Sequence, residues 1–188
     1  DLAPLVAKVS SLLLTVFEDK DPWLGKKLDK QALAEIVGQP ILQYLASREQ
    51  AVVNLYKKIA EVTRKAEITL NFVDQSPLLD MSSEDAISNS WQVGIDNSQI
   101  SQIINRYEPL IYRPQSDQVA SLASNYLKNV SPEITAILRP TYPDCTSAHN
   151  LLQKVDALVG LGVQEIDFYL LDTMRKSDLE NIKNALKN

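Results

Sequence analysis

Residues 134–146 read ITAILRPTYPDCT, a short apolar run that ends in Arg139-Pro140. Residues 109–117, PLIYRPQSD, repeat this arrangement with Arg113-Pro114. Short apolar runs bounded by turn-forming residues are typical of buried strands. Proline ends a strand because it lacks the N–H group that the next hydrogen bond needs. Each Arg-Pro pair is therefore predicted to mark the exit of a strand.

The same alternation of strand and helix runs along most of the chain. The predicted strands are ITLNFV (68–73), PLIYR (109–113), EITAILR (133–139) and EIDFYLL (165–171). The predicted helices span 29–37 with Asp29 as N-cap, Pro40 to about Ala66, 97–107, 116–130 with Ser116 as cap, 146–162 closed by Gly160 and Gly162, and 176–186. Strands separated by amphipathic helices predict parallel pairing with right-handed crossovers, so we expect an α/β fold. We also expect the strands to be apolar on both faces.

Two segments allow more than one interpretation. SLLLTVF (11–17) either continues a helix that begins at residues 2–9 or forms a fifth buried strand, and we favour the strand. The segment from 74 to 96 is polar and long for a connection, with a helical turn expected around Ser83 to Asn89. The sequence thus predicts four strands, or five if residues 11–17 form one, and neither number closes an eight-stranded barrel.

Composition excludes several classes of function. The 188 residues carry a net charge of −5 and a pI near 4.9, which argues against a nucleic-acid partner, since such proteins need a basic surface. No apolar run approaches the roughly 20 residues of a membrane-spanning helix, so we expect no membrane partner. We treat residues 1–188 as a single α/β domain, and a chain that starts at Asp1 without a leader is expected of a processed product or a piece of a longer protein.

Cys145 is the one cysteine of the chain. It cannot form an intrachain disulfide or a cysteine-based metal site, and a lone thiol fits a reducing compartment such as the cytoplasm. His149 falls inside a predicted helix and offers no partner for a nucleophilic thiol. Gly160 and Gly162 close a helix instead of opening one, so no glycine-rich phosphate loop is present. We expect neither a metal nor a cofactor.

The charged residues beside the predicted strands form two groups, one at the strand starts and one at the strand ends. Those at or just before predicted strand starts are Glu67, Glu108, Glu133 and Glu165. Those just past predicted strand ends are Glu18, Asp74, Arg113, Arg139 and Asp172. Ligands of parallel α/β proteins bind at the carboxyl ends of the strands, so the second set provides the candidate site residues. Arginines at strand exits also brace loops, and that structural interpretation stays open.

The last third of the chain, ILRPTYPDCTSAHNLLQKVDALVGLGVQEIDFYLLDTMRKSDLENIKNAL (137–186), resembles the end of a glycoside-hydrolase-like (β/α)8 barrel. Its final strand lies in GVQEIDFYLLDT (162–173), and the helix YLASREQAVVNLYKKIAEVTRKA (44–66) followed by ITLNF resembles a helix and strand from the middle of such a barrel. In outline the resemblance covers residues 11–188. It implies the C-terminal portion of a TIM-type barrel whose missing strands are replaced by an absent segment, another chain or covering loops. The alternative is an open parallel α/β sheet.

The resemblance also implies a carbohydrate ligand and a pair of catalytic carboxyl groups. Glu18 takes the first position if 11–17 is the fourth barrel strand, whereas the strand at 133–139 exits in Arg139, with Asp144 only later in the loop. Asp74 and Asp172 are the remaining carboxylates at strand exits. One hypothesis is therefore a glycoside hydrolase that acts through Glu18 and one of these aspartates, with carboxyl groups about 5 to 10 Å apart.

The other hypothesis is a non-catalytic binding or structural module. Here Arg113 and Arg139 hold an anionic or polyhydroxylated ligand, with Asp144 and Tyr142 nearby, or they brace loops. Tyr112 and Tyr142 are candidates for stacking on a sugar or hydrogen-bonding to it. If both arginines line a ligand cleft, both should face the carboxyl ends of the strands and remain partly open to solvent.

Overall fold

A computed structural model describes residues 3, 7, 29–79 and 86–186 of the chain. The elements in chain order are α2 (Lys30–Val37), α3 (Pro40–Lys65), β1 (Asn71–Asp74), η1 (Ser76–Leu78), η2 (Ile87–Val93), α4 (Asn97–Ile100), β2 (Arg106–Pro109), α5 (Ser116–Asn129), β3 (Glu133–Leu138), α6 (Ala148–Gly160), β4 (Glu165–Phe168), η3 (Leu171–Thr173) and α7 (Lys176–Ala185). The predicted strand at 11–17 and Glu18 lie outside the described residues.

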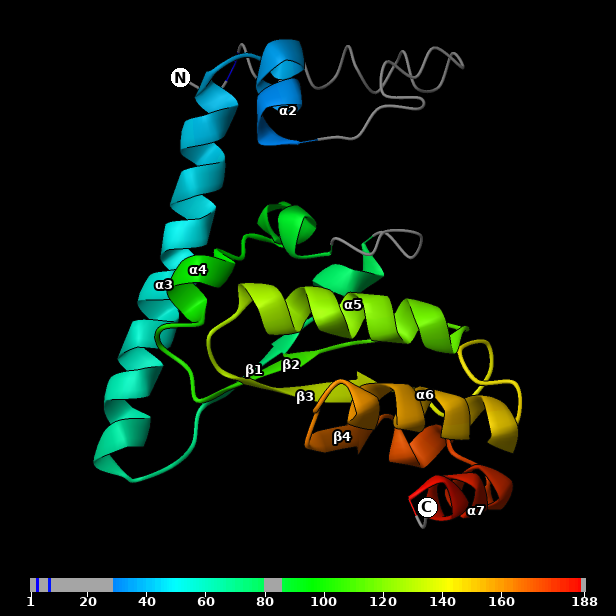
Figure 1. The fold of residues 1–188 in the computed structure, drawn as a ribbon. Helices are drawn as coiled ribbons and strands as arrows, with labels where there is room; N and C mark the ends of the chain where they lie inside the picture. Colours follow the sequence, from blue (N-terminus) through cyan, green and yellow to red (C-terminus); the bar gives the residue numbers. More distant parts are fainter. Residues whose placement is uncertain (1–2, 4–6, 8–28, 80–85, 187–188) are drawn as a thin grey trace.

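The strands form one parallel sheet in the order β1-β2-β3-β4. Because this order never reverses and parallel crossovers are right-handed, successive connections place their helices on the same face of the sheet. Figure 1 shows α5, α6 and α7 gathered on this side. The predicted α/β fold, with parallel strands alternating with helices, is confirmed. Within the described residues the sheet is open, with β1 and β4 at its edges.

The helix-covered face of the sheet carries the main core. Phe72, Tyr107, Ile134 and Leu138 project from three strands into this core, where they join buried residues of α5 and α6. Tyr107 and Tyr126 of α5 are both 0% exposed, and their ring centroids lie 5.7 Å apart. Since burial of a large apolar side chain contributes about 1.5–3 kcal/mol, this layer holds the helices to the sheet.

The opposite face of the sheet is largely polar, so the prediction of strands apolar on both faces is wrong for β1, β2 and β4. Side chains alternate between the two faces of a strand, which puts the neighbours of the core residues on this uncovered face. They are Asn71, Val73, Arg106, Glu108, Glu133, Thr135, Ile137, Glu165 and Asp167. Arg106 forms ion pairs with Glu133 and Glu165, and the Asn71 amide donates to Glu108 at 2.6 Å, so much of this charge is compensated within the face.

The predicted helices begin close to where their capping signals place them. Asp29 caps α2 by accepting a hydrogen bond from the Ala32 N–H at 2.7 Å, and α3 begins at Pro40, as predicted. The predicted cap at Ser116 is wrong by one residue: Gln115 is the N-cap, and Ser116 is the first residue of α5. In the connection from 74 to 96, the helical turn is η2, which begins at Ile87.

The predicted boundary between α4 and β2 is wrong. A helix was expected over 97–107 and a strand over 109–113, but α4 ends at Ile100 and β2 already begins at Arg106. Arg106 and Tyr107 pair with Asn71 and Phe72, and this pairing draws them into the sheet. As a result Glu108 lies inside β2 and not before its start. Among the described residues no helix combines the length and hydrophobicity needed to cross a bilayer.

Candidate functional site

The carboxyl ends of β2, β3 and β4 bring together one arginine and two tyrosines on the uncovered face of the sheet. Leu110 bridges Ile137, so the same offset puts Tyr112 opposite Arg139. Tyr169 follows β4, and its N–H donates to the Leu138 carbonyl at 2.9 Å. We call Arg139, Tyr112 and Tyr169 the arginine–tyrosine stack.

The geometry of the stack is layered. The guanidinium carbon of Arg139 lies 4.9 Å from the ring centroid of Tyr112. The rings of Tyr112 and Tyr169 are nearly parallel, with an interplanar angle of 19° and centroids 6.5 Å apart. Tyr169 is 47% exposed, whereas Tyr112 is 5% exposed. The stack therefore offers one open tyrosine beside a buried one that is covered by a cation.

The Tyr112 hydroxyl is buried and has no hydrogen-bond partner. Burial raises the pKa of Tyr112 to about 12; Tyr169 and Asp144 add to this rise, and the Arg139 charge partly opposes it. The hydroxyl is thus a protonated donor at neutral pH. Because an unsatisfied buried polar group costs about 1–3 kcal/mol, it is a group that a ligand atom would satisfy favourably.

Asp144 holds the Arg139 guanidinium, and Lys154 in turn holds the backbone of Asp144. Asp144 is 3% exposed and accepts from Nε and Nη2 of Arg139. Lys154 of α6 is 2% exposed, and its ammonium donates to the backbone carbonyl of Asp144. Burial lowers the pKa of Lys154, an effect that Cys145 and Asp144 partly oppose. Asp144 therefore orients the arginine through its Oδ2 atom.

Asp74 lies on the opposite side of the sheet, in the core. It is 0% exposed, and its Oδ1 accepts from the Ser76 N–H at 2.8 Å and the Ser76 hydroxyl at 2.6 Å. Its Oδ2 accepts from the hydroxyls of Tyr126 at 2.7 Å and Tyr107 at 3.2 Å. Burial and then the Asp74 charge raise the pKa values of both tyrosines, so they remain donors. Both carboxylate oxygens are therefore engaged by protein groups.

Arg113 does not join Arg139. It is 2% exposed and donates to the Tyr112 carbonyl at 3.1 Å and the Pro77 carbonyl at 3.0 Å. Arg113 and Tyr107 are an even number of positions apart, and side chains of a strand alternate between its two faces. Arg113 therefore points to the same helix-covered side as Tyr107. The expectation that both arginines stay open to solvent is therefore met by Arg139, whose side chain is 33% exposed, and not by Arg113.

The remaining predicted site residues are dispersed. Tyr142 is 80% exposed in the loop after β3, and Asp172 is exposed in η3, just past β4. Glu18 lies outside the described residues. The structure thus brings Arg139 and Asp144 together with Tyr112, and separates them from Asp74 and Arg113 by the thickness of the sheet.

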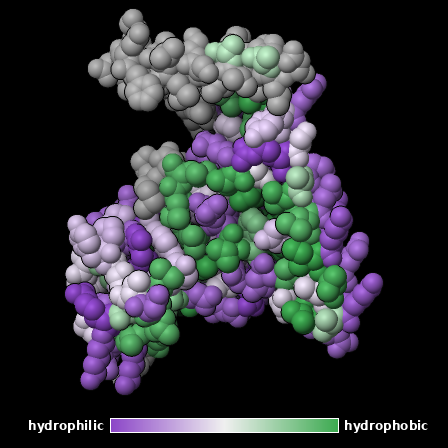
Figure 2. Space-filling model, turned by 180° about the vertical axis from the view of Figure 1, so that it is seen from behind, coloured by the Kyte–Doolittle hydropathy of each residue, from purple (hydrophilic) through white to green (hydrophobic). Residues whose placement is uncertain are grey.

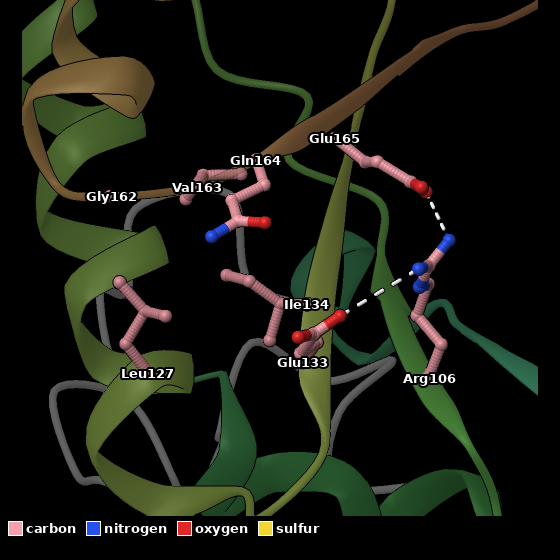
Figure 3. Close-up of a pocket in the computed structure, with 8 residues that line it drawn as sticks. All are labelled: Arg106, Leu127, Glu133, Ile134, Gly162, Val163, Gln164 and Glu165. Atoms are coloured by element: carbon pink, nitrogen blue, oxygen red, sulfur yellow. Dashed lines mark hydrogen bonds and ion pairs between the residues drawn. The ribbon is translucent and has the colours of Figure 1, made fainter.

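A hollow of about 230 Å³ lies at the other end of the strands (Figure 3). Arg106 stands at one side of it and reaches toward Glu133, at 3.6 Å, and toward Glu165. Leu127 and Val163 line the hollow from α5 and from the turn before β4. Its charged groups compensate each other at the amino ends of the strands, so we assign it a role in stability and place the candidate site at the carboxyl ends.

Sequence reasoning missed Tyr169 and Lys154. The signal for Tyr169 was the alternation of Glu165, Asp167 and Tyr169 on one face of the last strand. Lys154 carries no such signal, because a lysine in an amphipathic helix usually lies on its solvated face. The described part of the chain contains no group of three or more His, Cys, Asp or Glu side chains placed to hold a metal ion.

Fold and site together define an α/β protein with a parallel sheet wound in one direction and an arginine–tyrosine stack at its carboxyl edge. Comparison of the chain with protein-family models finds no match, and comparisons with curated proteins and with solved structures find none either. The assignment of function therefore rests on the chemistry of the stack.

Proposed function

We propose that the chain binds a carbohydrate at the arginine–tyrosine stack, as the C-terminal portion of a glycoside-hydrolase-like (β/α)8 barrel. The observation that carries the proposal is the exposed ring of Tyr169, held parallel to Tyr112 beside the Arg139 guanidinium. This array occupies the uncovered face at the carboxyl ends of the strands, where ligands of parallel α/β proteins bind.

The chemistry of the stack suits a polyhydroxylated ligand. A tyrosine ring provides a flat apolar surface with a polar edge, against which the apolar face of a sugar ring can pack. Asp144 engages Nε and Nη2 of Arg139, which leaves Nη1 as a donor for a ligand oxygen.

Binding is a better proposal than hydrolysis by the described aspartates. Asp74 and Asp144 are buried and engaged by protein donors, so neither is placed to take part in catalysis. A glycosidase needs two carboxyl groups on either side of the scissile bond. The proposal therefore assigns Asp144 to positioning Arg139, and assigns Asp74 to the core.

The test is a titration of the chain with oligosaccharides of glucose, xylose and N-acetylglucosamine, followed by NMR chemical shifts and calorimetry. We expect Tyr169→Ala to weaken binding about tenfold or more, which corresponds to a loss of about 1.4 kcal/mol. Tyr44→Ala is the matched control, because Tyr44 is 48% exposed and also has an arginine, Arg48, at 5.8 Å from its ring centroid. Equal affinities of the two variants, or no binding by the wild type, would contradict the proposal.

Hydrolysis is a second proposal, and the observation in its favour is Asp172. This carboxylate is exposed directly after β4, at the same edge of the sheet as Tyr169. It would act with a second carboxyl group, for which Glu18 is the candidate from sequence. Release of reducing ends from the same oligosaccharides should then be lost in Asp172→Asn while binding persists. A wild-type chain that binds a sugar but releases none would leave the binding proposal alone standing.

A further inference from the structure

The outer edge of β4 carries backbone groups that no described strand engages. The Tyr169 N–H donates to the Leu138 carbonyl, so the backbone groups of Tyr169 point toward β3. Backbone groups alternate in direction along a strand, which turns the N–H and C=O groups of Ile166 and Phe168 toward the outer edge. Among the described residues β4 pairs with β3 alone, so this edge has room for a further strand.

A largely apolar groove of about 350 Å³ lies beside this edge. Its apolar wall comes from α6, the turn before β4, β4 itself and the end of α7, through Val155, Val159, Val163, Ile166 and Leu186. Val159 and Leu186 are 61% and 58% exposed. Leu179 precedes Leu186 by two helical turns, which puts it on the same flank of α7, and it is 43% exposed. The two helices therefore offer open apolar side chains next to the edge of β4.

The uncovered side of the same edge is acidic. Glu165 and Asp167 are exposed there, on the opposite side of β4 from Ile166. Arg106 pairs with Glu165, whereas Asp167 forms no ion pair with any described residue. Figure 2, which views the molecule from behind, shows hydrophobic and hydrophilic residues side by side in the part that contains β4 and α7. The edge thus has apolar groups on its helix side and carboxylates on its other side.

We propose that an extended segment of a partner protein, in which apolar and basic side chains alternate, pairs with β4 as the next strand of the sheet. Its backbone engages the N–H and C=O groups of Ile166 and Phe168, as in other complexes formed by strand addition. Successive side chains of a strand point to opposite faces, so its apolar side chains pack against the groove. Its lysines or arginines then lie beside Glu165 and Asp167, and this charge complementarity defines the partner.

A second copy of the chain is a poorer occupant of this edge. In an antiparallel pairing of two β4 strands, a two-fold axis at Ile166 sets Glu165 opposite Asp167, and an axis at Asp167 sets two Asp167 side chains opposite each other. Like charges directly opposite destabilise a sheet, and charges on an edge strand discourage self-association. The open edge of β1 has Asn71 and Val73 on its uncovered face and no basic side chain. The inference does not depend on the carbohydrate proposal, because it uses no side chain of the arginine–tyrosine stack.

Amide hydrogen exchange of the whole chain, measured by NMR, tests the pairing. The probe is a peptide of about eight residues, within the usual length of a strand, that alternates lysine and valine. The amides of Asp167 and Tyr169 face β3 and serve as internal references. In the free chain we expect the amides of Ile166 and Phe168 to exchange faster than these references. At about ten times the Kd of the peptide their exchange should slow about tenfold, because only about a tenth of the edge remains free. Amides of Ile166 and Phe168 that match the references in the free chain, or that do not respond to the peptide, would overturn the proposal.

A matched peptide of alternating glutamate and valine tests the role of charge. We expect the wild type to bind the lysine peptide at least about fivefold more tightly than the glutamate peptide, and Asp167→Lys to lose this preference. Glu61→Lys is the control, since it makes the same change of charge at an exposed position of α3, whose Tyr56 packs on β1 at the other edge of the sheet. Equal binding of the two peptides by the wild type, or an equal effect of the two substitutions, would contradict the charge complementarity on which the proposal rests.

The groove is tested with the same lysine peptide. Leu186→Ser removes an exposed apolar side chain from the groove, so it should weaken binding about fivefold while the chain stays folded. Val62→Ser is the matched control, because Val62 is 68% exposed on α3 and lies outside the groove. Its affinity should stay within about twofold of the wild type. Equal affinities of the two variants would show that the peptide does not use the groove, and the proposal would fall.

Discussion

Replacement of Tyr126 by phenylalanine tests whether Asp74 is a structural or a catalytic residue. The Tyr126 hydroxyl donates to Asp74 Oδ2 at 2.7 Å, and both residues are 0% exposed. The substitution removes one hydroxyl and keeps the ring, so it opens no cavity of note. What remains on Oδ2 is the longer bond from Tyr107, at 3.2 Å.

The expected cost follows from the charge on the acceptor. A hydrogen bond to a charged group contributes about 1.5–3 kcal/mol, so Tyr126→Phe should lower the free energy of unfolding by about 2 kcal/mol. In a chain of this length that loss lowers Tm by about 4–8 °C. Tyr44→Phe is the control, since Tyr44 is 48% exposed and its hydroxyl should contribute less than about 0.5 kcal/mol.

The same variant changes the response to alkaline pH. Burial, and next the Asp74 charge, raise the pKa of Tyr126 above its ordinary value of 10.0, so the folded chain retains a proton that the unfolded chain loses. The stabilisation is fully present below pH 10 and is lost as the pH rises above it. The stability of the wild type should therefore decline more steeply above pH 10 than that of Tyr126→Phe.

Urea unfolding followed by circular dichroism measures both effects, with unchanged m-values as the check on two-state behaviour. A loss below 0.5 kcal/mol at pH 7 would refute the reasoning. Such a result would mean that Tyr126 does not hold the Asp74 carboxylate, and it would make a catalytic role for Asp74 tenable again.

Three further predictions concern the remaining charged groups. Arg113→Ala should lower the free energy of unfolding by about 3 kcal/mol, since two buried carbonyls lose charged donors; a change below 1 kcal/mol in urea melts would contradict this. Arg139→Lys should weaken oligosaccharide binding while stability shifts by about 1 kcal/mol or less, and unchanged calorimetric affinity would argue against the stack as the site. Hydrogen bonds from Arg175 lower the pKa of Asp178 below 3.8, so the advantage of the wild type over Asp178→Asn, about 1 kcal/mol at pH 7, should disappear as the pH falls toward 2; an advantage that persists at pH 2 would rule out this origin.

The fold class was predictable because its signals are local and repeated. Pro40 marks the start of α3, which continues with apolar residues at helical spacing, and β3 is apolar apart from Glu133 and Thr135. β2 was harder, because the sequence from Asn97 to Tyr107 continues a helix-like pattern of isoleucines. The pairing of Arg106 and Tyr107 with β1 overrides that pattern, and such a tertiary contact is not visible in the local sequence.

The candidate site was predictable in its position and not in its composition. Arg139 lies at a strand exit, where ligands of parallel α/β proteins bind, and its side chain is 33% exposed. Tyr112 and Tyr169, however, meet only because the register between β2, β3 and β4 aligns them with Arg139. No short stretch of sequence specifies that register.

The different roles of the two arginines follow from a single residue of register. Leu110 bridges Ile137, so Tyr112 is level with Arg139, and Arg113 is level with Pro140. Successive side chains of a strand point to opposite faces, and an offset of one residue therefore sends Arg113 into the core and Arg139 to the uncovered face. Two identical Arg-Pro exits thus produce a buried brace and a candidate ligand contact. Since a sheet wound in one direction keeps its helices on one face, the uncovered face is the side where a ligand at the carboxyl edge can reach the sheet, and Arg139 is the arginine that faces it.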